Sequence, residues 1–229
     1  MSKKESGGTP GDPIVPSTIK LDIETAAGAR KERVRFWNML ATFVPASGYV
    51  SPQGRTVNIL DLACGACDEA PILNRYFGGG SFDGPLSKRV RFVGIDKNEE
   101  KIKEAAAMND RPNFTFIPDS AADVSLYPEV PEVVDVVVIR HPHNSSNPAV
   151  WADIFRQGIA RLTDGGIMIS PSFSEKDHQR VVDLLQSLGC AIVVNERNPY
   201  SGRDLRQGES SDRYVVIAKK PQAEEAAKE

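Results

Sequence analysis

The fold is decided by an apolar run, Thr56-Val-Asn-Ile-Leu-Asp-Leu62, and the loop of small residues after it, Ala63-Cys-Gly-Ala-Cys67. The run has the length and apolar content of a strand that is buried on both faces, as in a parallel sheet. Small side chains in the loop allow a ligand to approach the backbone closely. A helical pattern over 68–77 follows directly, so this stretch predicts a strand–loop–helix unit.

The same alternation of strands and helices continues along the chain. Further strands are predicted at 89–95, 113–117, 133–139, 166–170, 191–195 and 214–218, and further helices at 99–108, 148–162 and 174–188. Asn147 and Ser174 are the expected N-caps of the last two helices. The last two strands have no helix between them and therefore predict an antiparallel hairpin. The pattern predicts one doubly wound α/β domain with a seven-stranded, mostly parallel sheet.

Boundaries follow from composition. We expect the α/β domain over 56–220, preceded by a helical extension over 18–55 whose helical pattern covers 24–44. Phe36 and Trp37 in this extension suggest a lid over a ligand pocket, and its basic run over 30–35 predicts a solvated helix face. Residues 1–17 and 221–229 are rich in glycine, proline, alanine or charge, and they predict disordered tails.

Charge and composition exclude several classes of protein. The 229 residues carry 28 Lys and Arg against 31 Asp and Glu, a net charge of −3, which disfavours binding to duplex nucleic acid. No run approaches the roughly 20 apolar residues of a membrane span. The N-terminus lacks the apolar run of a signal peptide, and the cysteines, three in number, do not suggest a secreted framework. We therefore expect a cytoplasmic protein; the sequence indicates no oligomeric state.

Acidic residues end three successive predicted strands. Asp61 lies at the end of the first, Asp96 follows the second and Asp119 follows the third. Ligands of open α/β sheets bind at the carboxyl ends of the strands, where these side chains would gather. A carboxylate at the tip of the second strand is the acceptor that a ribose diol needs.

Three motifs resemble those of the class I S-adenosylmethionine-dependent methyltransferases. Asn58-Ile-Leu-Asp-Leu-Ala-Cys-Gly65 resembles the first motif of that family, Val93-Gly-Ile-Asp-Lys-Asn98 the second, and Phe116-Ile-Pro-Asp-Ser120 the third. The resemblance covers roughly 56–219. It implies a Rossmann-like methyltransferase fold, S-adenosyl-L-methionine as the cofactor, and methyl transfer as the activity.

The resemblance also implies roles for the residues of these motifs. The loop with Ala63, Gly65 and Ala66 would hold the methionine part of the cofactor, and Asp61 would orient that loop or reach the amino group. Asp96, with Lys97 beside it, would bind the ribose. Asp119 and Ser120 would face the adenine. Glycines usually stand in the family where this chain has Ala63 and Cys67, and the cysteine would narrow the pocket.

The fourth strand ends in Arg140-His-Pro-His-Asn144, which the resemblance puts beside the transferred methyl group. His141 or His143 could be the general base, and Arg140 could bind a carboxylate or phosphate of the substrate. We therefore expect a small or medium acceptor that carries an anionic group.

Two other functions stay open. One is a catalytically inactive protein that binds S-adenosylmethionine and serves in regulation or interaction. The other is a thioredoxin-like dithiol oxidoreductase that uses Cys64 and Cys67, although Ala63 stands where thioredoxins have tryptophan. No metal is predicted, because the Cys pair lacks a second pair and the His pair, even with His178, lacks a further ligand.

Overall fold

The computed structural model describes residues 17–82, 85–201 and 212–221, with the backbone alone at 17–27. Its strands are β1 (Val57–Leu62), β2 (Val90–Ile95), β3 (Phe114–Ile117), β4 (Val134–Val138), β5 (Leu162–Ser172), β6 (Ala191–Arg197) and β7 (Tyr214–Lys219). Its helices are α1 (Ser17–Ala46), α2 (Ala70–Phe77), α3 (Glu99–Met108), α4 (Pro148–Arg161), α5 (Glu175–Ser187) and the short 3₁₀ helix η1 (Val124–Leu126).

The strands form one seven-stranded sheet in the order β3-β2-β1-β4-β5-β7-β6. The first five strands of the chain pair in parallel, and β7 pairs antiparallel with both β5 and β6. The doubly wound sheet and its antiparallel end are therefore confirmed. The order also puts β1 in the interior of the sheet, with β2 and β4 on its two sides.

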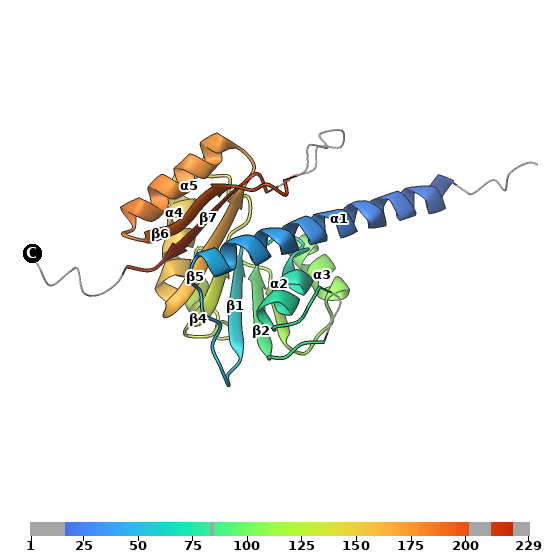
Figure 1. Cartoon of the computed structure of the whole chain (residues 1–229), viewed down its shortest axis with the longest axis horizontal. Coiled ribbons are helices and arrows are strands. Elements are labelled where there is room, and N and C mark those ends of the chain that lie inside the picture. Colours follow the sequence, from blue (N-terminus) through green and yellow to red (C-terminus); the bar gives the residue numbers. More distant parts are fainter. Residues whose placement is uncertain (1–16, 83–84, 202–211, 222–229) are drawn as a thin grey trace, which may run out of the picture.

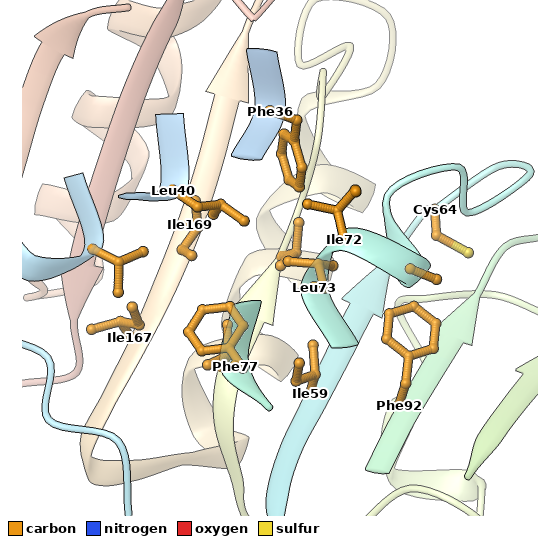
Figure 2. Packing of buried hydrophobic residues seen from close by; sticks show 14 of the residues in the cluster. Phe36, Leu40, Ile59, Cys64, Ile72, Leu73, Phe77, Phe92, Ile167 and Ile169 are labelled. Carbon is orange, nitrogen blue, oxygen red and sulfur yellow. The ribbon is translucent and has the colours of Figure 1, made fainter. Parts of the chain in front are cut away.

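Helices cover both faces of the sheet (Figure 1). On one face α1, α2 and α3 contribute to an apolar cluster with inward residues of the strands, and on the other α4 and α5 contribute to a second cluster. Figure 2 shows the first cluster, in which Leu40 of α1 lies beside Ile169 of β5 and Phe36 of α1 lies beside Ile72 of α2. Both faces of β1 are thus sealed, as its continuous apolar run requires.

The helix α1 differs from the predicted lid. It is longer than the 24–44 pattern, and its N-terminal half projects beyond the sheet (Figure 1). Phe36 is buried in the first cluster, and Trp37 packs edge-on against Tyr76 and Phe82. Both aromatic side chains therefore hold α1 on the sheet face. The tails predicted at 1–17 and 221–229 lie outside the described residues, apart from Ser17 and Pro221.

Helix starts show where local sequence decides geometry. The side chain of Asn98 accepts a hydrogen bond from the Lys101 N–H at the start of α3, and Ser174 accepts one from the Asp177 N–H at the start of α5. Asn147 is the N-cap of α4, as expected, but its side chain makes no capping hydrogen bond. Pro148 at the first position has no N–H and its ring fixes φ, so α4 begins without that bond.

Candidate functional site

A cavity of about 610 Å³ opens at the carboxyl ends of β1, β2 and β4. Here the direction of winding reverses, since β2 lies on one side of β1 and β4 on the other. Open α/β sheets bind ligands at such a point, and the volume falls within the range of roughly 300–1,000 Å³ of small-molecule sites. Of the predicted site residues all but Asp61 and Asp119 line it: Ala63, Gly65, Ala66, Asp96, Lys97, Ser120, Arg140, His141 and His143.

The loop over residues 63–67, here named the cofactor loop, has an unusual backbone. Ala63, Gly65 and Cys67 adopt φ angles of +57°, +56° and +49°. Residues other than glycine pay roughly 1–2 kcal/mol for this left-handed region. The loop therefore keeps the path of a glycine-rich motif where its side chains are alanine and cysteine. Cys67 is fully buried and does not line the cavity, so the expectation that it narrows the pocket is wrong.

Asp96 ties the cofactor loop to the end of β2. One of its carboxylate oxygens accepts a hydrogen bond from the Gly65 N–H at 2.8 Å, and the other accepts one from the Asn98 N–H at 2.8 Å. A carboxylate oxygen has two lone pairs, so each oxygen can accept a second bond from a ligand hydroxyl. Lys97 and Lys101 line the cavity beside it. Asp96 thus lies in the cavity wall with acceptor capacity left over.

At the end of β3 only one of the two predicted adenine-facing residues, Ser120, lines the cavity. Ser120 and Ala121 line the cavity, whereas Asp119 is exposed and accepts a hydrogen bond from the Ser120 N–H at 2.7 Å. Its carboxylate therefore braces the turn outside the cavity. Val150, Trp151 and Ile154 of α4 supply an apolar wall on this side, which the sequence did not assign.

Asp61 lies behind the cavity wall. Its side chain is fully buried, and within the described part of the chain neither carboxylate oxygen has a hydrogen-bond donor. Burial and then the repulsion of Glu69 raise the pKa of Asp61 well above its usual range. Glu69 is nearly buried and lines the cavity, so Asp61 reaches the site through Glu69.

The side chain of Arg140 is held between two carboxylates. Its guanidinium donates to both oxygens of Asp212, at 2.9 and 3.1 Å, and to Glu69 at 3.3 Å. It also lies over the ring of Phe36, 5.0 Å from the ring centre. Burial alone would lower the pKa of Arg140, but Asp212 and Glu69 raise it, so the cation is kept. The bidentate contact predicted with a substrate anion is instead made with Asp212.

His141 lies beside this network. Its Nε2 is 2.7 Å from Oδ1 of Asp212, close but not aligned well enough for a full hydrogen bond, and its ring packs 4.2 Å from that of Phe173. The backbone has a φ of +53°, held by the bond from the His141 N–H to the Pro171 carbonyl. Among the described residues Nδ1 makes no hydrogen bond. The ring therefore presents Nε2 to Asp212 and packs against Phe173.

The other histidines have different surroundings. His143 lines the cavity but is exposed, and no ion pair of the described residues includes it. His178 is far from a ligand role, since its Nε2 is 2.6 Å from the Asn195 side-chain oxygen and its ring stacks on Tyr214. No group of three or more His, Cys, Asp or Glu among the described residues could hold a metal ion.

Sequence reasoning missed Glu69 and Asp212 as site residues. Burial first acts to raise the pKa of Asp212, but Arg140 and His141 together bring it below its usual range. Glu69 carried a local signal, because it starts α2 directly after the cofactor loop. Asp212 carried none, since it lies in a polar segment before β7 and meets Arg140 only in the folded chain.

No helix in the described part of the chain is long and apolar enough to span a membrane. No protein-family model matches the sequence, and no curated protein does.

Solved structures do match. An S-adenosylmethionine-dependent methyltransferase from Clostridium acetobutylicum has a TM-score of 0.57 at 11% identity, with 90% of this chain and 98% of that one covered. An rRNA methylase from Streptococcus thermophilus has a TM-score of 0.53 at 12% identity, covering 77% and 92%. Aeropyrum pernix fibrillarin, with natively bound S-adenosyl-L-methionine, has 0.52 at 19%, covering 80% and 76%. With the strand order, these matches show that the chain has the fold of the class I S-adenosylmethionine-dependent methyltransferases.

Proposed function

We propose that the chain binds S-adenosyl-L-methionine in the cavity at the ends of β1, β2 and β4 and transfers its methyl group to an acceptor. The observation that carries this proposal is the cofactor loop bonded to Asp96 through the Gly65 N–H, at the edge where the winding reverses. The bound cofactor of a solved structure with this fold, fibrillarin, supports the same choice of ligand.

The residues present fit this cofactor. The cavity of about 610 Å³ is large enough for a nucleoside with an amino-acid tail. Asp96 has acceptor lone pairs free for ribose hydroxyls, and Ser120, Ala121 and Ile154 offer a mixed wall for a flat base. Asp68 and Glu69 stand at the loop end, where they would repel a pyrophosphate. A dinucleotide therefore fits less well than a cofactor without phosphate.

When bound, the cofactor supplies a methyl group on a positively charged sulfonium. The chain itself then has two tasks: it aligns donor and acceptor, and it takes up the proton that the acceptor loses. Alignment falls to the backbone of the cofactor loop, to Asp96 and to Ser120.

In this proposal His141 is the general base that takes the proton of the acceptor. Nε2 of the ring faces Asp212, so Nδ1 points away from that carboxylate and is proposed to take the proton. A base whose second nitrogen is oriented by a carboxylate is a recurring catalytic arrangement. His143 lines the same cavity without such a partner, which favours His141 as the catalytic residue.

The class of acceptor is wider than the sequence suggested. Arg140 is already neutralised by Asp212 and Glu69, so it offers no free charge to an acceptor anion. An rRNA methylase stands among the structures of the same fold. An acceptor screen therefore includes RNA as well as small molecules, with S-adenosylhomocysteine as the product measured.

Calorimetry with S-adenosylhomocysteine tests the cofactor site. Asp96→Ala removes bonds to a charged acceptor, each worth about 1.5–3 kcal/mol, so affinity should fall tenfold or more. Asp119→Ala is the matched control, an acid at the neighbouring strand tip outside the cavity, and its affinity should stay within about twofold of wild type. Equal affinity for wild type and Asp96→Ala would place the ligand elsewhere. Binding without turnover of any acceptor would favour the regulatory protein over the enzyme.

A further inference from the structure

The two sulfur atoms of the cofactor loop are joined. Cys64 and Cys67 form a disulfide with their Cα atoms 4.9 Å apart, a separation normal for such bonds. The bond closes a turn in which the Cys67 N–H also donates to the Cys64 carbonyl at 2.9 Å. The crosslink therefore spans the part of the loop that carries the left-handed residues Gly65 and Cys67.

The neighbouring strand leaves room for this sulfur pair. A β-carbon added at Gly94 of β2 would lie 2.6 Å from the Cys67 sulfur and 3.1 Å from the Cys64 sulfur. Approaches below 3.0 Å do not occur in folded proteins, so only glycine fits under the pair. Because Gly94 has no side chain, both sulfur atoms fit between the cofactor loop and the sheet.

Only one end of the pair is open to reagents. Cys64 lines the cavity, whereas Cys67 is fully buried. A small thiol or disulfide therefore reaches Cys64 through the space that the proposed cofactor would fill. Cys190, the remaining cysteine, is buried elsewhere, and burial raises the pKa of its thiol to about 11, which leaves it unreactive.

We propose that Cys64 and Cys67 are a reversible thiol–disulfide modification site whose state sets the affinity of the cavity for the methyl donor. This inference rests on the proposed cofactor function, which it extends with a form of regulation.

The chemistry is thiol–disulfide exchange with a low-molecular-weight disulfide. The Cys64 thiolate attacks one sulfur of that disulfide, and one small thiol leaves with an electron pair. The Cys67 thiol then loses its proton and attacks the Cys64 sulfur of the mixed disulfide, and the second small thiol leaves. The protein loses two electrons and two protons in forming one S–S bond, and the reagent becomes two thiols.

The oxidised form is the one expected to bind more tightly. The crosslink holds Cys67 at a positive φ that a free cysteine would pay to adopt, so it preorganises the loop that the cofactor contacts. Reduction removes the crosslink, so the cofactor loop is free to leave the backbone conformation with a positive φ at Cys67. By reciprocity, a bound ligand favours the oxidised state, and it also covers the cavity wall in which Cys64 lies.

The test measures S-adenosylhomocysteine binding by calorimetry to the full chain after equilibration with excess oxidised glutathione or with excess dithiothreitol. The oxidised chain should bind roughly threefold or more tightly than the reduced one. Cys64→Ser combined with Cys67→Gly removes both sulfurs and suits the positive φ at 67, so no mixed disulfide can form and the variant should bind equally under both conditions. Cys190→Ser is the matched control and should keep the wild-type difference.

A second readout follows the thiols themselves by alkylation and intact mass. With alkylation carried out in denaturant, where Cys190 also reacts, oxidised wild type should carry one alkylated thiol and reduced wild type three, and the ligand should slow reduction of the folded chain. Alkylation of Cys64 and Cys67 after oxidation would overturn the inference, as would equal ligand affinity in the two states, and either result would leave the cofactor site standing. No binding in either state would overturn the proposed function and this inference with it.

Discussion

The two ends of the cavity are built in different ways. The cofactor end is made of backbone groups, small residues and one carboxylate that bonds Gly65 and Asn98. The acceptor end is made of charged side chains from distant parts of the chain, with Arg140 bonded to Glu69 71 residues before it and to Asp212 72 residues after it. The geometry of the cofactor end is determined by short stretches of sequence at the strand ends. The charge network of the acceptor end forms only when three distant segments come together in the folded chain.

The largest expected effect comes from breaking the acceptor end. Arg140→Ala leaves Asp212 and Glu69 buried without their cation, and such a loss costs about 3–5 kcal/mol of unfolding free energy. Urea unfolding measures it. Lys103→Ala, which breaks an exposed ion pair with Glu99, is the control and should change the unfolding free energy by no measurable amount. Similar losses in the two variants would mean that the Arg140 network contributes no more than a surface pair.

A second prediction separates chemistry from binding at the same end. His141→Ala should lower kcat about 100-fold with the acceptor found by screening, because general-base catalysis contributes at least that much. Its affinity for S-adenosylhomocysteine should stay within about threefold, since the loss falls on the chemical step. His143→Ala, in the same loop but without a carboxylate partner, should keep most of the rate. Wild-type turnover in His141→Ala would leave catalysis to alignment alone.

A third prediction uses the opposite pKa shifts of the two buried acids. The pKa of Asp61 is raised, so the native state holds its proton longer than the unfolded chain, and stability falls as the pH rises above the usual aspartate range of about 4. Asp61→Asn should therefore stabilise the protein at pH 7, and the gain should vanish near pH 4. The pKa of Asp212 is lowered, so its contribution is present above about pH 4 and is lost on acidification.

Asp212→Asn should accordingly destabilise at pH 7, with the deficit shrinking as the pH falls through and below the usual aspartate range. Thermal unfolding of both variants and wild type from pH 3 to pH 8 measures the difference. Curves that run parallel to wild type in both variants would show that neither acid is perturbed. The loss in Asp212→Asn should be smaller than in Arg140→Ala, because asparagine keeps the shape and one acceptor.

The smallest effect concerns two asparagines that look equivalent in sequence. Asn98 caps α3 at the cofactor end and Asn147 precedes α4 without a capping bond. Asn98→Ala should cost about 1 kcal/mol of unfolding free energy, within the usual range for lost caps. Asn147→Ala should cost nothing measurable. Equal costs would mean that α4 is capped in solution by a bond that the structure lacks.

Prediction from sequence succeeded where the signal was local. The strand runs, the small residues of the cofactor loop and the acid at Asp96 gave the sheet and most of one cavity wall. It failed for Asp119, whose carboxylate turns outward, and for Arg140, whose partner Asp212 cannot be foreseen from a polar segment. At Asn147 it found the N-cap position of α4 but not the missing side-chain bond, which Pro148 makes dispensable. Long-range pairing of charged side chains is set by the fold, so no spacing rule reveals it.

The place of β7 in the sheet has a consequence for how the protein is made. The last strand of the chain lies between β5 and β6, and β6 joins the sheet by pairing with it. Until Tyr214–Lys219 has left the ribosome, β5 is an open edge and β6 has no sheet to join. Exposed edges invite pairing with other chains. The nascent chain therefore keeps an aggregation-prone edge until β7 has been synthesised, and Asp212, just before β7, reaches Arg140 at the same step.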